Sequence, residues 1–165
     1  MDNIILIGMP GSGKSTVGVL LAKMMGYGFV DTDLLIQHFE GKKLYEILRD
    51  KGNDYFSEIE NKIISGVQAR QTVIATGGSA VFGREAMEHL SSIGTVVYLK
   101  VSLRELRRRV KNFSTRGIMM KNGQTLDDIF TERSPLYEKY ADITVNCTGG
   151  SLEKNAKKII AALGK

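Results

Sequence analysis

The chain has 165 residues, 42% of them hydrophobic and 25% charged, which is enough for one domain with a full hydrophobic core and argues against a disordered chain. The formal net charge of +5 suits a protein that handles anions such as nucleotides, but no lysine or arginine tract resembles a nucleic-acid-binding arm. The single cysteine, Cys147, excludes an intrachain disulfide, and no apolar run approaches the ~20 residues that a membrane-spanning helix needs. We therefore expect a cytoplasmic monomer without a signal peptide that binds neither nucleic acid nor membrane.

Short apolar runs alternate with longer amphipathic stretches, a pattern typical of an α/β domain with a parallel sheet. The candidate strands are residues 4–7, 29–30, 72–75, 95–99 and 143–145. We predict a three-layer α/β/α sandwich around five parallel strands in the order 2-3-1-4-5, formed by residues 1–165 as a single domain.

The helical patterns lie between these strands. Residues 14–25 carry apolar side chains at helical spacing. Two or three helices fit between residues 34 and 70, with a break near Gly52. Three further helices, at 103–110, 126–140 and 152–163, each follow a serine or threonine that can cap them. Glu105, three residues after Ser102, indicates a capping box.

Residues 8–15 read GMPGSGKS and match the phosphate-loop pattern G-x-x-x-x-G-K-[ST], between a strand and a helix as that motif requires. Its glycines let successive backbone N–H groups point at phosphate oxygens, Lys14 would reach the β- and γ-phosphates, and the Ser15 hydroxyl would ligate Mg²⁺. The expected contacts with ATP come from one segment: Gly8, Gly11, Ser12, Gly13, Lys14, Ser15 and Thr16.

Asp31 and Asp33 directly follow the second strand, whose end should face the same crevice as the phosphate loop. One carboxylate could hold Mg²⁺ while the other accepts a proton from an attacking hydroxyl. The alternative is that one of them only caps the helix that begins near Leu34. Residues 112–124 have no clear period and contain Arg116, so they are predicted to form a mobile lid.

These elements, together with Gly77-Gly78 and the E-R-x-P-L-Y segment at 132–137, resemble the shikimate kinases in order and spacing over nearly the whole chain. The resemblance implies an ATP-dependent kinase that phosphorylates a hydroxyl of shikimate. It implies catalytic roles for Lys14, Asp33 and Arg116, and Mg²⁺ ligation by Ser15 and Asp31. It also implies acceptor binding by Asp33, Gly77, Gly78 and Arg133, adenine packing by Arg109, and acceptor-binding helices at 34–60.

Judged from the residue types alone, two of these arginines could have simpler structural roles. Arg133 has Asp127, Asp128 and Glu132 nearby in sequence and could form an ordinary surface ion pair. Arg109 could lie on a solvated basic helix face with Arg107 and Arg108.

Two positions depart from the family pattern. Shikimate kinases usually carry F-R-x-x-E where this chain has Phe56-Ser57-Glu58-Ile59-Glu60, and a third glycine where it has Ser79. Losing a charge-assisted bond to a substrate carboxylate costs about 1.5–3 kcal/mol. Lys51 or Lys62 could replace the missing charge.

Other functions therefore remain open. The acceptor could be an amino-acid alcohol, a polyol or a sugar acid, with an ammonium group pairing to Glu58 or Glu60. A nucleoside monophosphate kinase would need more arginines around its second phosphate, and a GTPase would show an N-K-x-D element. A nucleotide-binding module without an acceptor is the remaining alternative.

Overall fold

The computed structural model describes residues 2–112 and 115–165. Its five strands form one parallel sheet in the order β2-β3-β1-β4-β5, as predicted. They are β1 (Asn3–Ile7), β2 (Gly28–Asp31), β3 (Thr72–Ala75), β4 (Gly94–Lys100) and β5 (Ile143–Asn146). Each predicted strand is confirmed to within one residue at either end.

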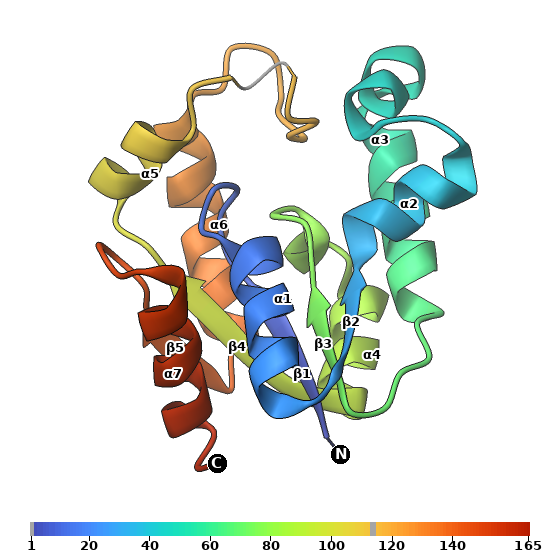
Figure 1. Ribbon diagram of the computed structural model, residues 1–165. Coiled ribbons are helices and arrows are strands. Elements are labelled where there is room, and N and C mark those ends of the chain that lie inside the picture. The colour runs from blue at the N-terminus through green and yellow to red at the C-terminus, as the bar shows by residue number, and fades with distance from the viewer. Residues whose placement is uncertain (1, 113–114) are drawn as a thin grey trace.

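Helices cover both faces of this sheet (Figure 1). On one face lie α1 (Lys14–Met25) and α7 (Leu152–Ala162), which pack against each other, and on the other lie α4 (Arg84–Ile93) and α6 (Leu126–Tyr140). The remaining helices are α2 (Thr32–Glu40), α3 (Leu44–Ser65) and α5 (Leu103–Arg109), and a single 3₁₀ turn, η1, spans Ala80–Phe82. The predicted break at Gly52 is a kink inside α3, where the backbone leaves helical geometry at φ 82° and ψ 175°.

The helix starts follow from their capping residues. The side chains of Asp31, Thr125 and Ser151 accept hydrogen bonds from backbone N–H groups in the first turns of α2, α6 and α7. Ser102 caps α5 in the same way, but the predicted capping box is wrong in its second half. The Glu105 carboxylate pairs with Arg108 and Arg109 instead of reaching back to the backbone of the cap.

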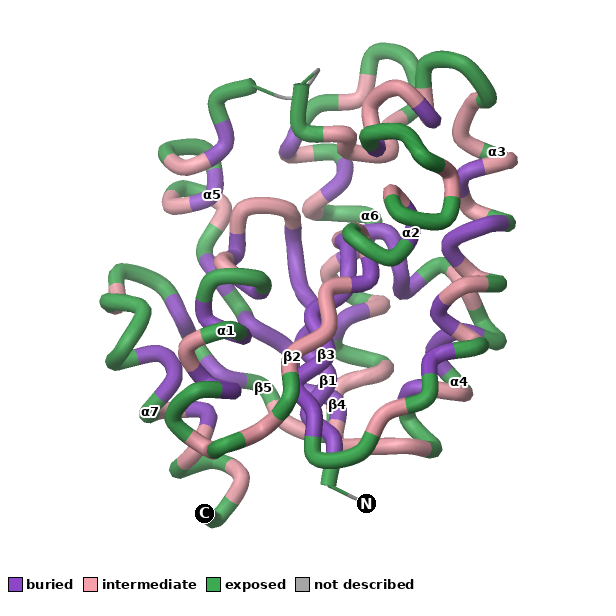
Figure 2. The backbone as a smooth tube through the Cα atoms, turned by 45° about the vertical axis from the view of Figure 1, so that its right-hand side comes forward, coloured by how far each residue is buried: buried purple, intermediate pink, exposed green. Residues whose placement is uncertain are grey.

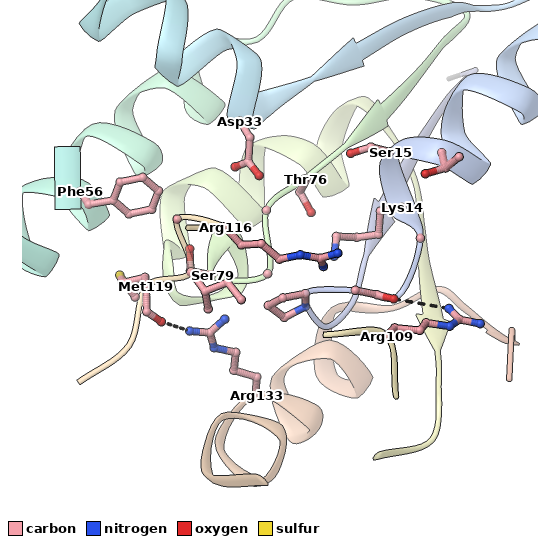
Figure 3. A pocket seen from close by; sticks show the side chains of 18 of the residues that line it. Lys14, Ser15, Asp33, Phe56, Thr76, Ser79, Arg109, Arg116, Met119 and Arg133 are labelled. Atoms are coloured by element: carbon pink, nitrogen blue, oxygen red, sulfur yellow. Dashed lines mark hydrogen bonds between the residues drawn. The ribbon is translucent and has the colours of Figure 1, made fainter. Parts of the chain in front are cut away.

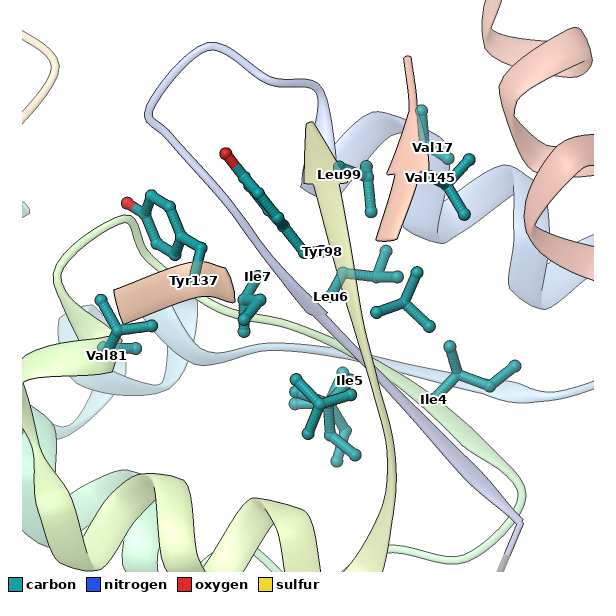
Figure 4. Packing of buried hydrophobic residues seen from close by; sticks show 14 of the residues in the cluster. Ile4, Ile5, Leu6, Ile7, Val17, Val81, Tyr98, Leu99, Tyr137 and Val145 are labelled. Carbon is teal, nitrogen blue, oxygen red and sulfur yellow. The ribbon is translucent and has the colours of Figure 1, made fainter. Parts of the chain in front are cut away.

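The hydrophobic core lies on both sides of the central strand β1, whose side chains are all buried (Figures 2 and 4). Ile4, Ile5, Leu6 and Ile7 are each at most 1% exposed. Such a continuous apolar run is what a strand covered on both faces requires. A second, smaller cluster joins α2 and α3: Ile36, Leu44, Ile47, Phe56 and Ile59.

The carboxyl ends of β2, β3 and β1 lie side by side at one edge of the sheet, because these strands are parallel neighbours in that order. The phosphate loop follows β1, Asp31 ends β2, and Gly77-Gly78 follow β3 by one residue. The topology therefore positions three functional segments at one edge. Within residues 2–112 and 115–165, no helix has the length and apolar character required to cross a bilayer.

Burial of β1 gives a direct test of this core. Ile5→Ala should lower the free energy of unfolding by about 2–5 kcal/mol, because the removed atoms leave a cavity that a packed sheet cannot close. Val19→Ala is the control, since Val19 on α1 is 52% exposed and should change stability by less than about 0.5 kcal/mol. Urea unfolding of both variants measures the difference, and equal losses would contradict the assigned core.

Candidate active site

The phosphate loop wraps around the amino group of Lys14. Lys14 Nζ donates hydrogen bonds to the backbone oxygens of Gly8, at 2.7 Å, and Met9, at 2.8 Å. Gly8, Gly11 and Gly13 all have positive φ angles, and Gly13 is the left-handed residue at the start of α1. Burial lowers the pKa of Lys14 to about 8, and the nearby Asp33 carboxylate opposes this shift. The loop thus holds a cation at the start of a helix, an arrangement that favours anions.

Asp31 and Asp33 have separate surroundings. The Oδ1 atom of Asp31 accepts hydrogen bonds from the backbone N–H groups of Asp33 and Leu34, so Asp31 is the helix cap that the sequence left as an alternative. Its Oδ2 atom accepts a hydrogen bond of 2.7 Å from Ser15 Oγ. Asp31 therefore caps α2 and also contacts the phosphate loop. Capping fixes the carboxylate beside the hydroxyl that the loop motif assigns to Mg²⁺.

Asp33 faces a cavity of about 520 Å³ that also meets the phosphate loop (Figure 3). Burial raises the pKa of Asp33 to about 6, Asp31 adds to the rise, and Lys14 opposes it. A carboxyl group with a pKa in this range can take up and release a proton near neutral pH.

Most of the predicted site residues line this one cavity: Gly11, Gly13, Lys14, Ser15, Thr16, Asp33, Gly77, Gly78, Arg109, Arg116 and Arg133. Gly8, Ser12 and Asp31 are not among the residues that line it. Gly8 and Ser12 instead accept hydrogen bonds from Lys14. Sequence reasoning did not single out Pro10 of the predicted phosphate loop, or Gly117 and Ile118 of the predicted lid, as lining residues. It missed Phe56, Thr76 and Leu152 altogether. Thr76 carried a usable signal, because it is a polar residue at the carboxyl end of a buried strand.

Arg133 is buried, with 2% exposure, and does not form the surface ion pair that its acidic neighbours allow. Its Nη2 atom donates to the backbone oxygen of Met119, and its guanidinium lies over the Phe82 ring at 5.4 Å. Its Nε atom is buried and has no hydrogen-bond partner among the described residues. A guanidinium held this way retains N–H groups for a planar anion in the cavity.

Gly77 and Gly78 leave no room for side chains. A Cβ at Gly77 would lie 2.6 Å from Asp33 Oδ1, and one at Gly78 would lie 2.7 Å from Pro10 Cδ and 3.2 Å from Arg133 Nη1. The Tyr137 hydroxyl donates a hydrogen bond of 2.6 Å to the Gly78 oxygen, which ties α6 to the same turn. The glycine pair therefore lets α2, the phosphate loop and α6 approach one another.

Residues 116–119 of the predicted lid line the cavity, and residues 113–114 lie outside the described part of the chain. Arg116 Nη1 lies 3.7 Å from the place that a Cβ on Gly11 would occupy, so Arg116 reaches the phosphate loop. The lid also contacts α3, where Asn53 Nδ2 donates to the Met120 oxygen at 2.8 Å and Ser57 Oγ lies 3.1 Å from Met119 Sδ.

Arg109 lies at the other end of the cavity, partly buried, with Nη1 3.4 Å from the Gly11 oxygen. This places Arg109 at the cavity rather than on a fully solvated helix face. Neither lysine offered as a replacement charge is among the described residues that line the cavity. Lys51 instead pairs with Glu40 at 3.1 Å.

A phosphate loop on a parallel sheet, with a carboxyl group and arginines facing the same cavity, defines a P-loop kinase. The family model for shikimate kinase matches residues 10–164. A shikimate kinase from Clostridium botulinum is 41% identical, over 100% of this chain and 98% of the relative, and one from Persephonella marina is 36% identical over 99% of each. The structure resembles a shikimate kinase from Acinetobacter baumannii in complex with shikimate, with a TM-score of 0.89 and 30% identity over 99% of this chain and 93% of that one.

The chain belongs to the shikimate kinase family. The expectation of an ATP-dependent kinase for a small-molecule substrate is confirmed, and so is the predicted fold.

Glu60 gives a pH-dependent test of the site. Burial raises the pKa of Glu60 from 4.5 to about 8, so the folded chain holds this proton more tightly than the unfolded chain. The resulting stability is fully present below about pH 4.5 and is lost as the pH rises through about 8. Glu60→Gln has no proton to lose, so its stability relative to the unsubstituted protein should rise by up to about 1.4 kcal/mol per pH unit in this window.

Urea unfolding of both proteins at several pH values between about 5 and about 9 measures this difference. Lys14 and Asp33 contribute to the pH dependence of stability in both proteins, so their contributions are removed when the two free energies of unfolding are subtracted. If the free energies of unfolding of the two proteins differed by the same amount at every pH, the assignment of Glu60 as a buried, protonated group would be wrong.

Proposed function

We propose that this protein transfers the γ-phosphoryl group of ATP to a hydroxyl group of shikimate, forming shikimate 3-phosphate and ADP. The observation that carries the proposal is that Arg133, Asp33 and Lys14 face one cavity. In that order they offer a site for a carboxylate, a proton acceptor and a phosphate-binding cation. The complex of shikimate with the A. baumannii relative supports the choice of acceptor.

In the proposed mechanism, the acceptor carboxylate binds to Arg133, whose Nε atom has no partner among the described residues. Asp33 accepts the proton of the attacking hydroxyl as its oxygen bonds to the γ-phosphorus, and the bond from that phosphorus to the β–γ bridging oxygen breaks to release ADP. Lys14 and Arg116 stabilise the negative charge on the transferred group. Gly77 and Gly78 permit the close approach of the acceptor, and the lid at 112–124 excludes water.

ATP would bind with its phosphates on the phosphate loop and its adenine against Arg109. Ser15 and Asp31 offer a hydroxyl and a carboxylate 2.7 Å apart, both oxygen ligands that Mg²⁺ accepts. The other ligands would be phosphate oxygens and water. The bound Mg²⁺ would neutralise charge on the β- and γ-phosphates.

We also propose a domain organisation and a cellular setting for this chain. Residues 1–165 would act as one kinase domain, with α2 and α3 as the acceptor-binding region, slightly longer than the predicted 34–60. We propose that the enzyme works as a monomer in the cytoplasm, where the buried, free Cys147 stays reduced.

The base assignment is tested by Asp33→Asn. We expect kcat to fall by about 10²–10⁴-fold, because the amide cannot accept the proton, while the Kd for ATP changes by less than about twofold. Since Asp33 titrates at about 6, kcat/KM of the unsubstituted enzyme should fall as the pH drops below that value. Stopped assays and ATP titration measure these quantities. A loss of ATP affinity as large as the loss of turnover would show that Asp33 serves the nucleotide instead.

The acceptor is tested by ADP release from Mg-ATP across shikimate, a sugar acid, a polyol, an amino-acid alcohol and a nucleoside monophosphate. We expect shikimate to be turned over fastest, with Lys14→Met as the blank because it lacks the cation on the phosphates. Turnover of a different alcohol alone would mean that Ser57 marks a change of substrate. ATP binding without turnover of any acceptor would indicate a nucleotide-binding module.

A further inference from the structure

The two departures from the family pattern, Ser57 and Ser79, line one hollow together with the buried carboxyl group of Glu60. Ser79 Oγ donates a hydrogen bond of 2.8 Å to Glu60 Oε1, and both residues are buried, at 6% and 3% exposure. Ser57 lies one helical turn before Glu60 on α3, but its hydroxyl contacts Met119 Sδ. Ser79 also lines the main cavity, and Glu60 lies behind it, where it lines the adjacent hollow instead.

Glu60 has no ion-pair partner within 4.0 Å among the described residues. From α2, Asp33 faces it across Gly77, where a Cβ would lie 2.6 Å from Asp33 Oδ1 and 3.2 Å from Glu60 Oε2. From α6, Arg133 is near enough to influence it, but donates instead to the Met119 oxygen. Its own helix contributes Glu58 and Asn61, and α4 contributes Arg84 and Glu85, to an adjacent hollow of about 300 Å³.

These surroundings favour the neutral form of Glu60. Burial raises its pKa to about 8, the Ser79 hydrogen bond opposes the rise, and the Asp33 charge adds to it. A protonated carboxyl group both donates and accepts hydrogen bonds. Its Oε2 atom is buried without a partner among the described residues, so the pair retains unused hydrogen-bonding capacity on the side of Gly77 and Asp33.

We propose that Ser79 is a specificity-determining residue that binds a non-reacting hydroxyl of the acceptor, and that Glu60, which accepts the hydrogen bond of Ser79 behind the cavity wall, is the residue that positions it. This rests on the proposed phosphorylation of shikimate at the same site. The pair replaces the charge of a second arginine with a neutral, hydrogen-bonding wall. The favoured acceptor then carries one carboxylate for Arg133 and at least two hydroxyl groups, one for Asp33 and one for Ser79.

The same wall disfavours an acceptor with an ammonium group. A neutral Glu60 offers no counter-charge to a cation, and Glu58 is exposed rather than part of the main cavity. A carboxylated polyol therefore fits better than an amino-acid alcohol. Ionisation of Glu60 would add a buried negative charge next to Asp33 and close to the bound carboxylate, and so would weaken acceptor binding.

The test is the KM for shikimate between about pH 6.5 and about pH 9.5, at saturating Mg-ATP. In the unsubstituted enzyme, KM should rise above about pH 8, by up to about tenfold per pH unit, while kcat changes less. Glu60→Gln imitates the neutral carboxyl group, so its KM should match that of the unsubstituted enzyme at pH 7 and stay flat at higher pH. Glu58→Gln makes the same charge change on the same helix and should reproduce the unsubstituted profile.

Ser79→Ala isolates the hydroxyl contact. It should raise the KM for shikimate about 5–20-fold with little change in kcat, as expected for the loss of one hydrogen bond to substrate. Shikimate has two non-reacting hydroxyl groups, and each can be removed in a deoxy analogue. For the analogue that lacks the hydroxyl bound by Ser79, Ser79→Ala should not raise KM further, because the contact is already lost.

The outcomes separate this inference from the function on which it rests. A Glu60→Gln enzyme that follows the unsubstituted pH profile would overturn the role of Glu60. An unchanged KM in Ser79→Ala would overturn the role of Ser79, and in both cases the proposed function would stand. No turnover of shikimate by the unsubstituted enzyme would overturn the proposed function and this inference together.

Discussion

The site depends on the close approach of three elements at Gly77-Gly78. Atoms of Asp33 from α2, Pro10 from the phosphate loop and Arg133 from α6 lie 2.6, 2.7 and 3.2 Å from where a Cβ on one of these glycines would be. Any side chain there would push Asp33 away from the phosphate loop or displace the Arg133 guanidinium. Because Tyr137 also bonds to the Gly78 oxygen, the turn after β3 fixes the distance between the two halves of the cavity.

The charged groups buried around this turn influence one another's protonation. Asp33 supports the charged form of Lys14, which burial weakens, while Lys14 in turn favours the ionised form of Asp33. Asp31 remains outside the main cavity, where it caps α2 and holds Ser15. Two carboxyl groups separated by one residue therefore have different environments, a condition under which neighbouring acids can take different roles. Glu60 completes the set as a carboxyl group whose burial favours its neutral form.

The sequence was sufficient for the strands and their order, because buried parallel strands give apolar runs and the phosphate loop fixes the first of them. It was insufficient for α4, whose N-cap is Gly83 and offers no side-chain oxygen to mark the start. For Arg133, acidic neighbours in sequence offered an ion pair that the fold does not use. The Ser79–Glu60 bond joins residues 19 positions apart through tertiary packing, so no local pattern could show it. The sequence offered capping of α2 as one alternative for Asp31, but the second hydrogen bond of Asp31, accepted from Ser15, was visible only in three dimensions.

The bond between Ser79 and Glu60 also bears on how far either residue can be replaced alone. Ser79 Oγ is the one side-chain donor to Glu60 among the described residues. Replacing Ser79 by glycine would leave both buried oxygens of Glu60 without a side-chain donor, at a cost of about 1–3 kcal/mol. The effects of substitutions at 60 and 79 are therefore not additive, because each residue sets the cost of changing the other.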